Sequence, residues 1–138
     1  MNKPVINIKN LNVDYITDKN PINAVRDVTF EIFSGEIFGL VGESGSGKST
    51  VVQAMMRILP PPAIISKGEV IINNEDILAS SSLDVVGMRW KKISIVMQSA
   101  LNALNPVLSI RDQIHDVLKT HKNLIGLDAD ERAKELLS

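Results

Sequence analysis

The sequence predicts an α/β fold, and three observations support that prediction. A glycine-rich loop at residues 42–50 follows an apolar stretch, 36–41, and precedes a stretch with helical spacing, 51–59. Alternating apolar residues before position 33 are typical of antiparallel strands. The nearly continuous apolar run at residues 93–97 is typical of a strand buried on both faces of a parallel sheet. We therefore expect an antiparallel opening that leads into a parallel sheet covered by helices.

Two strands are expected ahead of the loop. Residues 5–15 are rich in β-forming side chains, and the parity of their apolar positions changes between Ile8 and Leu11. A change of parity within one strand indicates a β-bulge or a local twist. Turn-forming residues at 17–21 separate this strand from a second alternating stretch at 28–33. These two strands predict an antiparallel sheet.

The glycine-rich loop fits the pattern Gly, any four residues, Gly, Lys, Ser or Thr. Inward-pointing N–H groups at a helix N-terminus bind phosphates, and glycine allows close approach of the backbone. The Lys48 ammonium is expected to reach the β- and γ-phosphates, the Ser49 hydroxyl to coordinate Mg²⁺, and Thr50 to lie near the α-phosphate. The predicted phosphate-binding residues are Gly42, Glu43, Ser44, Gly45, Ser46, Gly47, Lys48, Ser49 and Thr50.

The elements after the loop alternate between helix and strand. A helix over 51–59 is stopped by the prolines at 60–62, and a strand follows at 68–72. The serines at 80–82 precede a helix that includes Val85, Val86 and Trp90. The next strand, 93–97, ends at a glutamine.

Two helices with N-terminal capping pairs are expected after residue 106. Ser109 is followed three residues later by Asp112, and Asp128 is followed in the same way by Glu131. Both pairs precede apolar residues at helical spacing. The second helix runs to the last residue of the sequence, Ser138.

Composition excludes several classes of protein. A chain of 138 residues can bury a sizeable core, and its net charge of −1 gives no reason to expect nucleic acid or an anionic membrane as partner. The absence of cysteine excludes disulfide scaffolds and thiolate metal sites. No apolar run approaches the roughly 18 residues needed to cross a bilayer, and the N-terminus lacks the apolar core of a signal peptide. We therefore expect a soluble, cytosolic chain.

Taken together, these motifs resemble the nucleotide-binding subunit of ATP-binding-cassette (ABC) transporters. The resemblance includes Tyr15, the glycine-rich loop, the strand that begins at 68–70, and an apolar strand that ends in Gln98. Residues 41–49 and 98–106 are most similar to the oligopeptide and dipeptide importers. The second of these stretches is the more discriminating, because its Leu-Asn-Pro is typical of the peptide and nickel group.

The resemblance implies a fold and a division of the chain. The fold would be an incomplete P-loop NTPase core with an N-terminal antiparallel β-subdomain and the start of a helical subdomain. Residues 1–138 would form the N-terminal part of one nucleotide-binding domain. Its parts would be 1–35, mainly antiparallel β, then 36–98, the P-loop core, and 99–138, the start of the helical subdomain.

The same resemblance implies ATP and Mg²⁺ as cofactors. Residues 42–50 would be the Walker A motif, and Tyr15 would stack on adenine, as a flat aromatic ring can. Gln98, in the Q-loop, would contact the Mg²⁺ and the attacking water, so Ser49 and Gln98 would be the metal contacts. The family couples ATP hydrolysis to transport. Its partners would be transmembrane permease subunits and a second nucleotide-binding subunit, on the cytoplasmic, inner face of the cell membrane.

Three family motifs do not occur in these 138 residues. They are the Leu-Ser-Gly-Gly-Gln signature, the apolar strand ending in Asp-Glu known as Walker B, and the switch histidine. The expectation is therefore a truncated domain that holds nucleotide but does not hydrolyse ATP efficiently. Missing strands would leave an exposed sheet edge, so self-association of the chain is expected.

Two other classes of function stay open. A small self-sufficient P-loop NTPase or kinase would need an acidic Mg²⁺ ligand from this chain, for which Asp76 and Asp128 are the candidates. A non-enzymatic nucleotide-binding module would use Lys48 for affinity alone. The Asp-x-x-Gly of GTPases occurs at 84–87, but it follows serines instead of a strand, and no guanine-reading Asn-Lys-x-Asp is present.

The remaining polar residues carry less specific signals. The run Arg89-Trp90-Lys91-Lys92 fits either a nucleic-acid patch or the solvated end of a helix, and the net charge favours the helix end. His115 and His121 lack a metal-ligand partner at useful spacing and are expected to be surface histidines.

Overall fold

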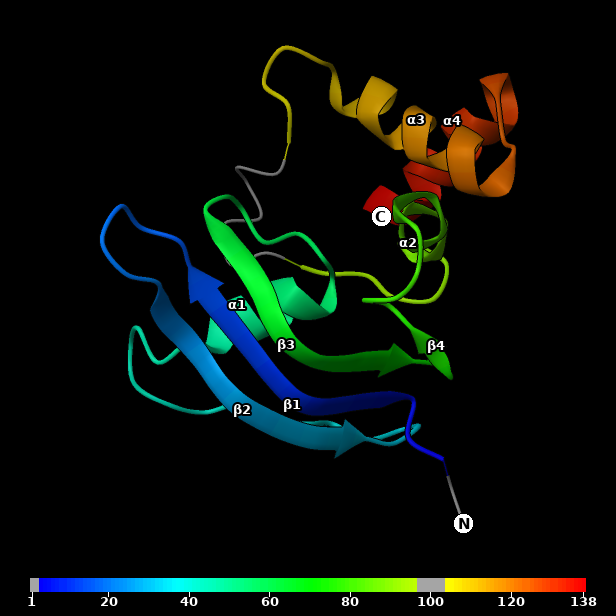
Figure 1. Ribbon diagram of the computed structural model, residues 1–138. Coiled ribbons are helices and arrows are strands. Elements are labelled where there is room, and N and C mark those ends of the chain that lie inside the picture. Colours follow the sequence, from blue (N-terminus) through cyan, green and yellow to red (C-terminus); the bar gives the residue numbers. More distant parts are fainter. Residues whose placement is uncertain (1–2, 97–103) are drawn as a thin grey trace. The chain divides into compact units, whose positions relative to one another are not determined.

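The computed structural model describes residues 3–96 and 104–138, and the chain forms two compact units, Met1–Lys92 and Ile93–Ser138. Within the described residues the first unit contains a sheet and two short helices, and the second contains a helix pair (Figure 1). The elements of the first unit are β1 (Ile6–Tyr15), β2 (Ile22–Ile32), α1 (Lys48–Met55), β3 (Ala63–Ile72), β4 (Glu75–Asp76) and α2 (Ser82–Met88). The elements of the second unit are α3 (Ile110–Lys122) and α4 (Gly126–Leu137).

The sheet is antiparallel with the strand order β2-β1-β3-β4 (Figure 1). β1 is a central strand, and its Tyr15 lies opposite Ile22 of β2 and Ala63 of β3. The register of β1 against β2 shifts between Ile8 and Leu11, which confirms the predicted bulge. The antiparallel opening of the chain is therefore confirmed, and β3 extends the same sheet.

The core of the first unit lies between the sheet and α1. β1 contributes Ile8, Leu11 and Val13, all of which are fully buried. α1, which packs on β1 and β2, contributes Val51 and Ala54. Burial of one large aliphatic side chain of this kind stabilises the fold by about 1.5–3 kcal/mol. This core fixes α1, and with it the glycine-rich loop, to β1 and β2.

α1 ends earlier than the sequence predicts. The apolar spacing predicts a helix that runs to Leu59 and stops at the prolines, but the last helical residue is Met55. Arg57 has a φ of 49°, a left-handed conformation that cannot continue an α-helix. The chain therefore leaves the helix before the prolines are reached.

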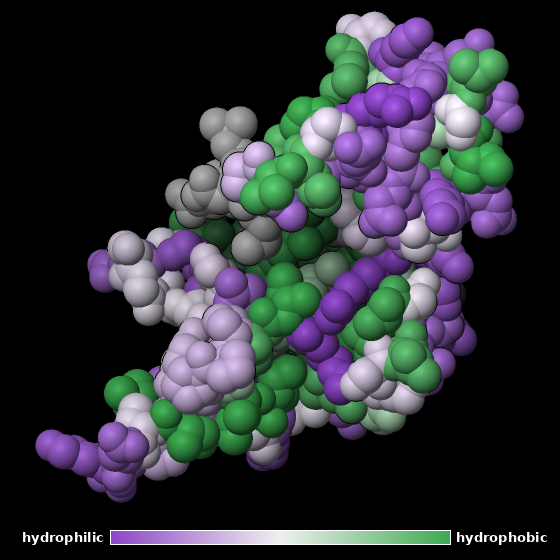
Figure 2. Space-filling model, turned by 90° about the horizontal axis from the view of Figure 1, so that it is seen from above, coloured by the Kyte–Doolittle hydropathy of each residue, from purple (hydrophilic) through white to green (hydrophobic). Residues whose placement is uncertain are grey.

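The prediction of strands at 36–41 and at 93–97 is wrong for the described residues. Neither 36–41 nor 93–96 belongs to the sheet. A strand needs backbone partners, and among residues 3–96 and 104–138 the sheet provides none for these two segments. Figure 2 shows apolar residues exposed on the molecular surface. Within 36–41, Ile37 is fully exposed. Phe38 stacks on Phe30 of β2, with ring centroids 4.8 Å apart.

The second unit confirms one of the two predicted helix starts. The Ser109 Oγ accepts a hydrogen bond from the Asp112 N–H at 3.0 Å and caps α3. α4, in contrast, begins at Gly126, so Asp128 lies in its first turn and is not the N-cap. The two helices bury Leu118, Ala129 and Ala133 between them, with Ile114 and Leu124 packed alongside. In the part of the chain that the structure describes, no helix has the length and apolar character to span a membrane.

Candidate phosphate-binding site

The glycine-rich loop has the backbone geometry that its glycines allow. Gly45 and Gly47 have φ values of 80° and 88°, in the left-handed region. A Cβ on Gly47 would also lie 2.6 Å from the carbonyl oxygen of Ala24 in β2. A Cβ on Gly42 would lie 2.8 Å from the Ser46 Oγ. The loop therefore packs tightly against the β2 backbone at Gly47, a position that only glycine fits without strain, whereas the contact at Gly42 is with a movable side chain.

The Lys48 side chain folds back across the loop. Its Nζ donates to the carbonyl oxygen of Gly42 at 2.8 Å, to the carbonyl oxygen of Glu43, and to the Ser46 Oγ at 3.2 Å. An ammonium group has three donors, and each has an acceptor on the loop. The positive charge is thereby held against the loop by the loop's own oxygen atoms.

The N-terminus of α1 completes the loop. Gly47 is the N-cap and no side chain caps the helix, while the first turn contains no acidic residue. The Val51 N–H donates to the Gly47 carbonyl oxygen at 2.9 Å and makes the first hydrogen bond within the helix. The N–H groups of the helical residues before Val51 therefore have no acceptor within the helix. Uncapped N–H groups and the positive end of the helix dipole favour a bound anion.

A cavity of about 270 Å³ brings the loop together with Tyr15. Tyr15 reaches the cavity from the end of β1, and Lys48, Ser49 and Thr50 reach it from the first turn of α1. The remaining lining residues are Ala24, Gly45 and Gly47. Ala24 was missed by sequence reasoning, because an alanine in a strand carries no motif. The structure therefore places the aromatic residue and the phosphate loop around one space.

Other predicted site residues are not brought into this cavity. Gln98 lies outside the described residues. The predicted loop residues that do not line the cavity are Gly42, Glu43, Ser44 and Ser46. The Asp76 Oδ1 accepts from the Leu78 N–H at 2.8 Å, so this carboxylate caps a turn. Asp128 belongs to α4 in the second unit. Neither candidate acid of a self-sufficient NTPase therefore lines the loop cavity, and the described residues contain no cluster of three or more metal-binding side chains.

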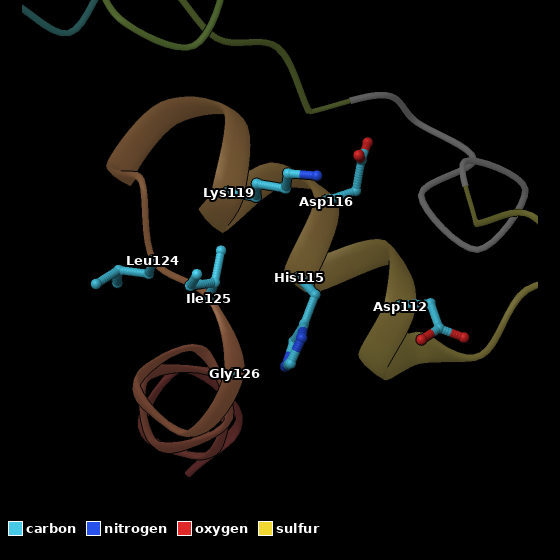
Figure 3. Close-up of a pocket in the computed structure, with 7 residues that line it drawn as sticks. All are labelled: Asp112, His115, Asp116, Lys119, Leu124, Ile125 and Gly126. Atoms are coloured by element: carbon cyan, nitrogen blue, oxygen red, sulfur yellow. The ribbon is translucent and has the colours of Figure 1, made fainter.

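A second pocket, of about 250 Å³, lies in the helix pair. Figure 3 shows its residues on α3, on the connection to α4, and at Gly126, the first residue of α4. The lining is Asp112, His115, Asp116, Lys119, Leu124, Ile125 and Gly126. It combines carboxylates, a lysine and apolar side chains, and lies in the unit without the phosphate loop.

His115 is not the surface histidine that the sequence predicts. Its side chain is 21% exposed, and its Nε2 lies 2.9 Å from the Asp130 Oδ1. The Arg111 guanidinium donates to both carboxylate oxygens of Asp130, at 2.6 and 2.9 Å. This bidentate contact is the main reason that the pKa of Asp130 falls from 3.8 to about 2. The three side chains join α3 to α4, so the histidine has a structural role.

The fold and the loop define a class of protein: a phosphate-binding-loop nucleotide-binding protein. Residues 25–138 also match a family model described as ABC transporter. The chain belongs to the ABC transporter family, as the resemblance of its motifs predicts.

The curated relatives carry the names of peptide transport proteins. The chain is 36% identical over 135 residues to the dipeptide transport ATP-binding protein DppD of Bacillus subtilis, and 34% identical over 134 residues to the oligopeptide transport ATP-binding protein OppD of the same organism. It is 40% identical over 134 residues to a putative peptide import ATP-binding protein of Brucella melitensis. These matches cover 96–97% of this chain but 37–40% of each relative, so the chain spans about two fifths of their length.

Solved structures of similar fold are ABC cassettes. One is the dimeric post-hydrolysis state of the ATP-binding cassette MJ0796 bound to ADP and Pi, with a TM-score of 0.79 and 26% identity. A second dimeric structure of the same bacterial ABC transporter cassette has a TM-score of 0.78 and 28% identity. The first comparison covers 94% of this chain and 54% of the cassette. The predicted fold class is therefore confirmed.

Proposed function

We propose that this chain binds Mg-ATP, with the phosphates on residues 42–50 and the adenine on Tyr15. The single observation that carries the proposal is the cavity in which Tyr15 meets Lys48, Ser49 and Thr50. The spacing of these residues on two elements suits a ligand with an aromatic ring at one end and anionic groups at the other. The ADP and Pi bound to the similar cassette MJ0796 support the same ligand class.

The donor set at the loop also fits a magnesium ion carried by the nucleotide. Mg²⁺ takes hard oxygen ligands, typically one or two from the protein and the rest from phosphates and water. The Ser49 hydroxyl lines the same cavity as Lys48, so it would supply such a ligand. Gln98 is proposed as the second protein contact. When bound, the ion neutralises charge on the phosphate oxygens, while Lys48 and the helix N-terminus hold those oxygens in place.

For the whole protein we propose the ATPase subunit of an ABC transporter that imports peptides. The names of the relatives support peptides as the transported solute. The dimeric cassettes support a second nucleotide-binding subunit as one partner. Transmembrane permease subunits would be the other partners, and they would hold the subunit on the cytoplasmic face of the membrane.

Calorimetric titration of the chain with Mg-ATP tests the binding proposal. Lys48→Ala removes a charge-assisted contact to phosphate, for which about 1.5–3 kcal/mol and hence roughly 10- to 150-fold in affinity is expected. The matched control is Lys91→Ala, which removes a lysine that does not line the cavity. Folded wild-type chain that fails to bind Mg-ATP, or equal binding by the Lys48 variant, would refute the proposal.

A second titration tests the place of the adenine. Tyr15→Ala should weaken Mg-ATP binding by about 1–3 kcal/mol, the usual contribution of a base stacked on an aromatic ring. Tyr15→Phe keeps the ring and should bind like the wild type. Inorganic tripolyphosphate has no base, so its affinity should be the same for all three proteins. A loss of tripolyphosphate affinity in Tyr15→Ala would contradict the stacking role.

A further inference from the structure

The C-terminal end of α1 is held by a side chain from another helix. Arg89, the C-cap residue of α2, donates from its Nη2 to the carbonyl oxygens of Met56 at 3.0 Å and Arg57 at 3.1 Å. The last turn of α1 has no basic residue of its own. The guanidinium thus brings a positive charge to a helix end where carbonyl oxygens carry partial negative charge.

A second arginine makes the same kind of contact in the opposite direction. Arg57, just past the end of α1, donates from its Nη1 to the carbonyl oxygens of Ile77 at 3.1 Å and Ser80 at 2.7 Å. These residues lie in the turn that leads into α2, which begins at Ser82. Arg57 and Arg89 thus form a reciprocal arginine pair. Together they fix the end of α1 to both ends of the segment that contains α2.

The receiving turn is itself ordered by Asp76. The Asp76 side chain accepts from the Leu78 N–H at 2.8 Å, and its carbonyl oxygen accepts from the Ser80 N–H at 3.1 Å. Ile77 is 2% exposed, so the turn is anchored in the core. The Asp76 hydrogen bonds, which do not involve α1, therefore order the turn that holds the carbonyls bound by Arg57.

The attachment matters because α1 is short. It has eight residues, and helices of fewer than about 12 residues are marginal in water unless tertiary contacts stabilise them. Fraying from the C-terminus would reach the first turn within about two turns of helix. The N–H groups of that first turn are the ones proposed to bind phosphate. The contacts at the opposite end of the helix therefore add to the core packing of Val51 and Ala54 in keeping these N–H groups aligned.

We infer that Arg89 is a positioning residue for phosphate binding, which acts by capping the C-terminus of α1 and so keeps the first-turn N–H groups of that helix aligned on the phosphates. This inference rests on the proposed nucleotide binding at residues 42–50. The run Arg89-Trp90-Lys91-Lys92 does lie at the end of a helix, α2, and its last three residues are exposed, as the sequence predicts. Arg89 alone gains a role inside the protein.

The action of Arg89 is structural rather than directly electrostatic. Eight helical residues span about 12 Å, which exceeds the screening length of about 8 Å at physiological ionic strength. A charge that far from the phosphate contributes little to its binding. The ratio of wild-type to Arg89-variant affinity should therefore be nearly the same at about 0.05 M and about 0.5 M salt.

Titrations with tripolyphosphate and with Mg-ATP test the inference. Arg89→Gln removes the charge, and both ligands should bind about three- to thirtyfold more weakly, as a lost helix-end interaction predicts. Arg89→Lys restores a cation and should recover most of the loss. The matched control is Ser81→Ala, which removes the cap of α2, where the Ser81 Oγ accepts from the Asp84 N–H at 3.2 Å. This control should lower the unfolding midpoint and leave both affinities unchanged below the transition.

The outcomes are distinguishable. Wild-type chain that binds neither ligand refutes the proposed function and this inference with it. Wild-type binding together with unaltered affinities in a folded Arg89→Gln variant refutes the inference alone, as does an equal loss in Ser81→Ala.

Hydrogen exchange on the wild-type chain decides the matter if Arg89→Gln does not fold. Linkage is reciprocal, so if the reciprocal arginine pair favours phosphate binding, bound phosphate must in turn stabilise the contacts of that pair. Saturation with tripolyphosphate should slow hydrogen exchange of the Arg89 backbone N–H, which donates to the Val85 carbonyl oxygen at 3.2 Å. Unchanged exchange there would overturn the inference.

Discussion

Gly47→Ala, compared with Gly45→Ala, measures how tightly the phosphate loop packs on β2. Both glycines have left-handed φ values, 88° and 80°, so each alanine incurs a conformational strain of about 1–2 kcal/mol. Only at Gly47 does the new Cβ meet another group, the Ala24 carbonyl oxygen at 2.6 Å. At Gly45 nothing lies within 4 Å. The difference between the two variants isolates the steric overlap.

The overlap at Gly47 is with backbone in a paired strand. Val25, the residue after Ala24, lies opposite Val13 of β1, so β2 cannot retreat without disturbing the sheet. Overpacking of this kind costs about 1–3 kcal/mol. The expected losses of unfolding free energy are therefore about 1–2 kcal/mol for Gly45→Ala and about 2–5 kcal/mol for Gly47→Ala.

Urea unfolding without nucleotide is the assay. The single tryptophan of the chain, Trp90, lies in the same unit as the loop, so its fluorescence reports on that unit. The absence of nucleotide separates stability from ligand binding, which both substitutions affect. If Gly47→Ala were no less stable than Gly45→Ala, the loop would not be packed on the Ala24 carbonyl as the structure shows, and the reasoning would fail.

Three further predictions concern other parts of the chain. Asp130→Asn should abolish an acid transition of the helix pair, which circular dichroism would follow. Because Arg111 lowers the pKa of Asp130 to about 2, the ionised Asp130 carboxylate stabilises the helix pair fully above about pH 4, and this stabilisation is lost as pH falls toward 2. Gly68→Ala places a Cβ 2.6 Å from the β1 backbone at a φ of 114°, so it should lower the free energy of unfolding by about 2–5 kcal/mol in urea. The control is Gly35→Ala, whose Cβ would have no atom within 4 Å, so it should show only the conformational strain of about 1–2 kcal/mol. Ser109→Ala removes the N-cap of α3 and should lower the unfolding free energy of the helix pair by about 1 kcal/mol, measured by thermal melting followed by far-ultraviolet circular dichroism.

Local signals in the sequence predicted the local structure well. The bulge between Ile8 and Leu11 and the cap at Ser109 depend on residues that are close in the chain, and both are confirmed. The glycine-rich loop was located by its motif, because a phosphate-binding turn requires glycines at fixed positions. The family was predicted from this loop together with Tyr15, the strand at 68–70 and the stretch 98–106, and it is confirmed.

Features that depend on distant residues were not predictable in this way. The segments 36–41 and 93–96 have strand-like composition, but a strand forms only where backbone partners lie beside it. α1 ends at Met55, and just past this end Arg57 has a left-handed backbone and donates to carbonyls 20 and 23 residues further along. His115 pairs with a carboxylate 15 residues away on α4, a separation at which no simple spacing rule applies.

The position of β1 between β2 and β3 has a kinetic consequence. β2 pairs with β1 through a short connection, whereas Ala63 to Ile72 of β3 must find β1 across more than half of the first unit. The phosphate loop and α1 lie inside the long connection that this second pairing closes. Closure of a long loop is entropically costly and slows folding, so the β1–β2 hairpin should form first. A ligand that orders the connecting segment would then speed the later step, so the refolding rate would increase with the concentration of that ligand.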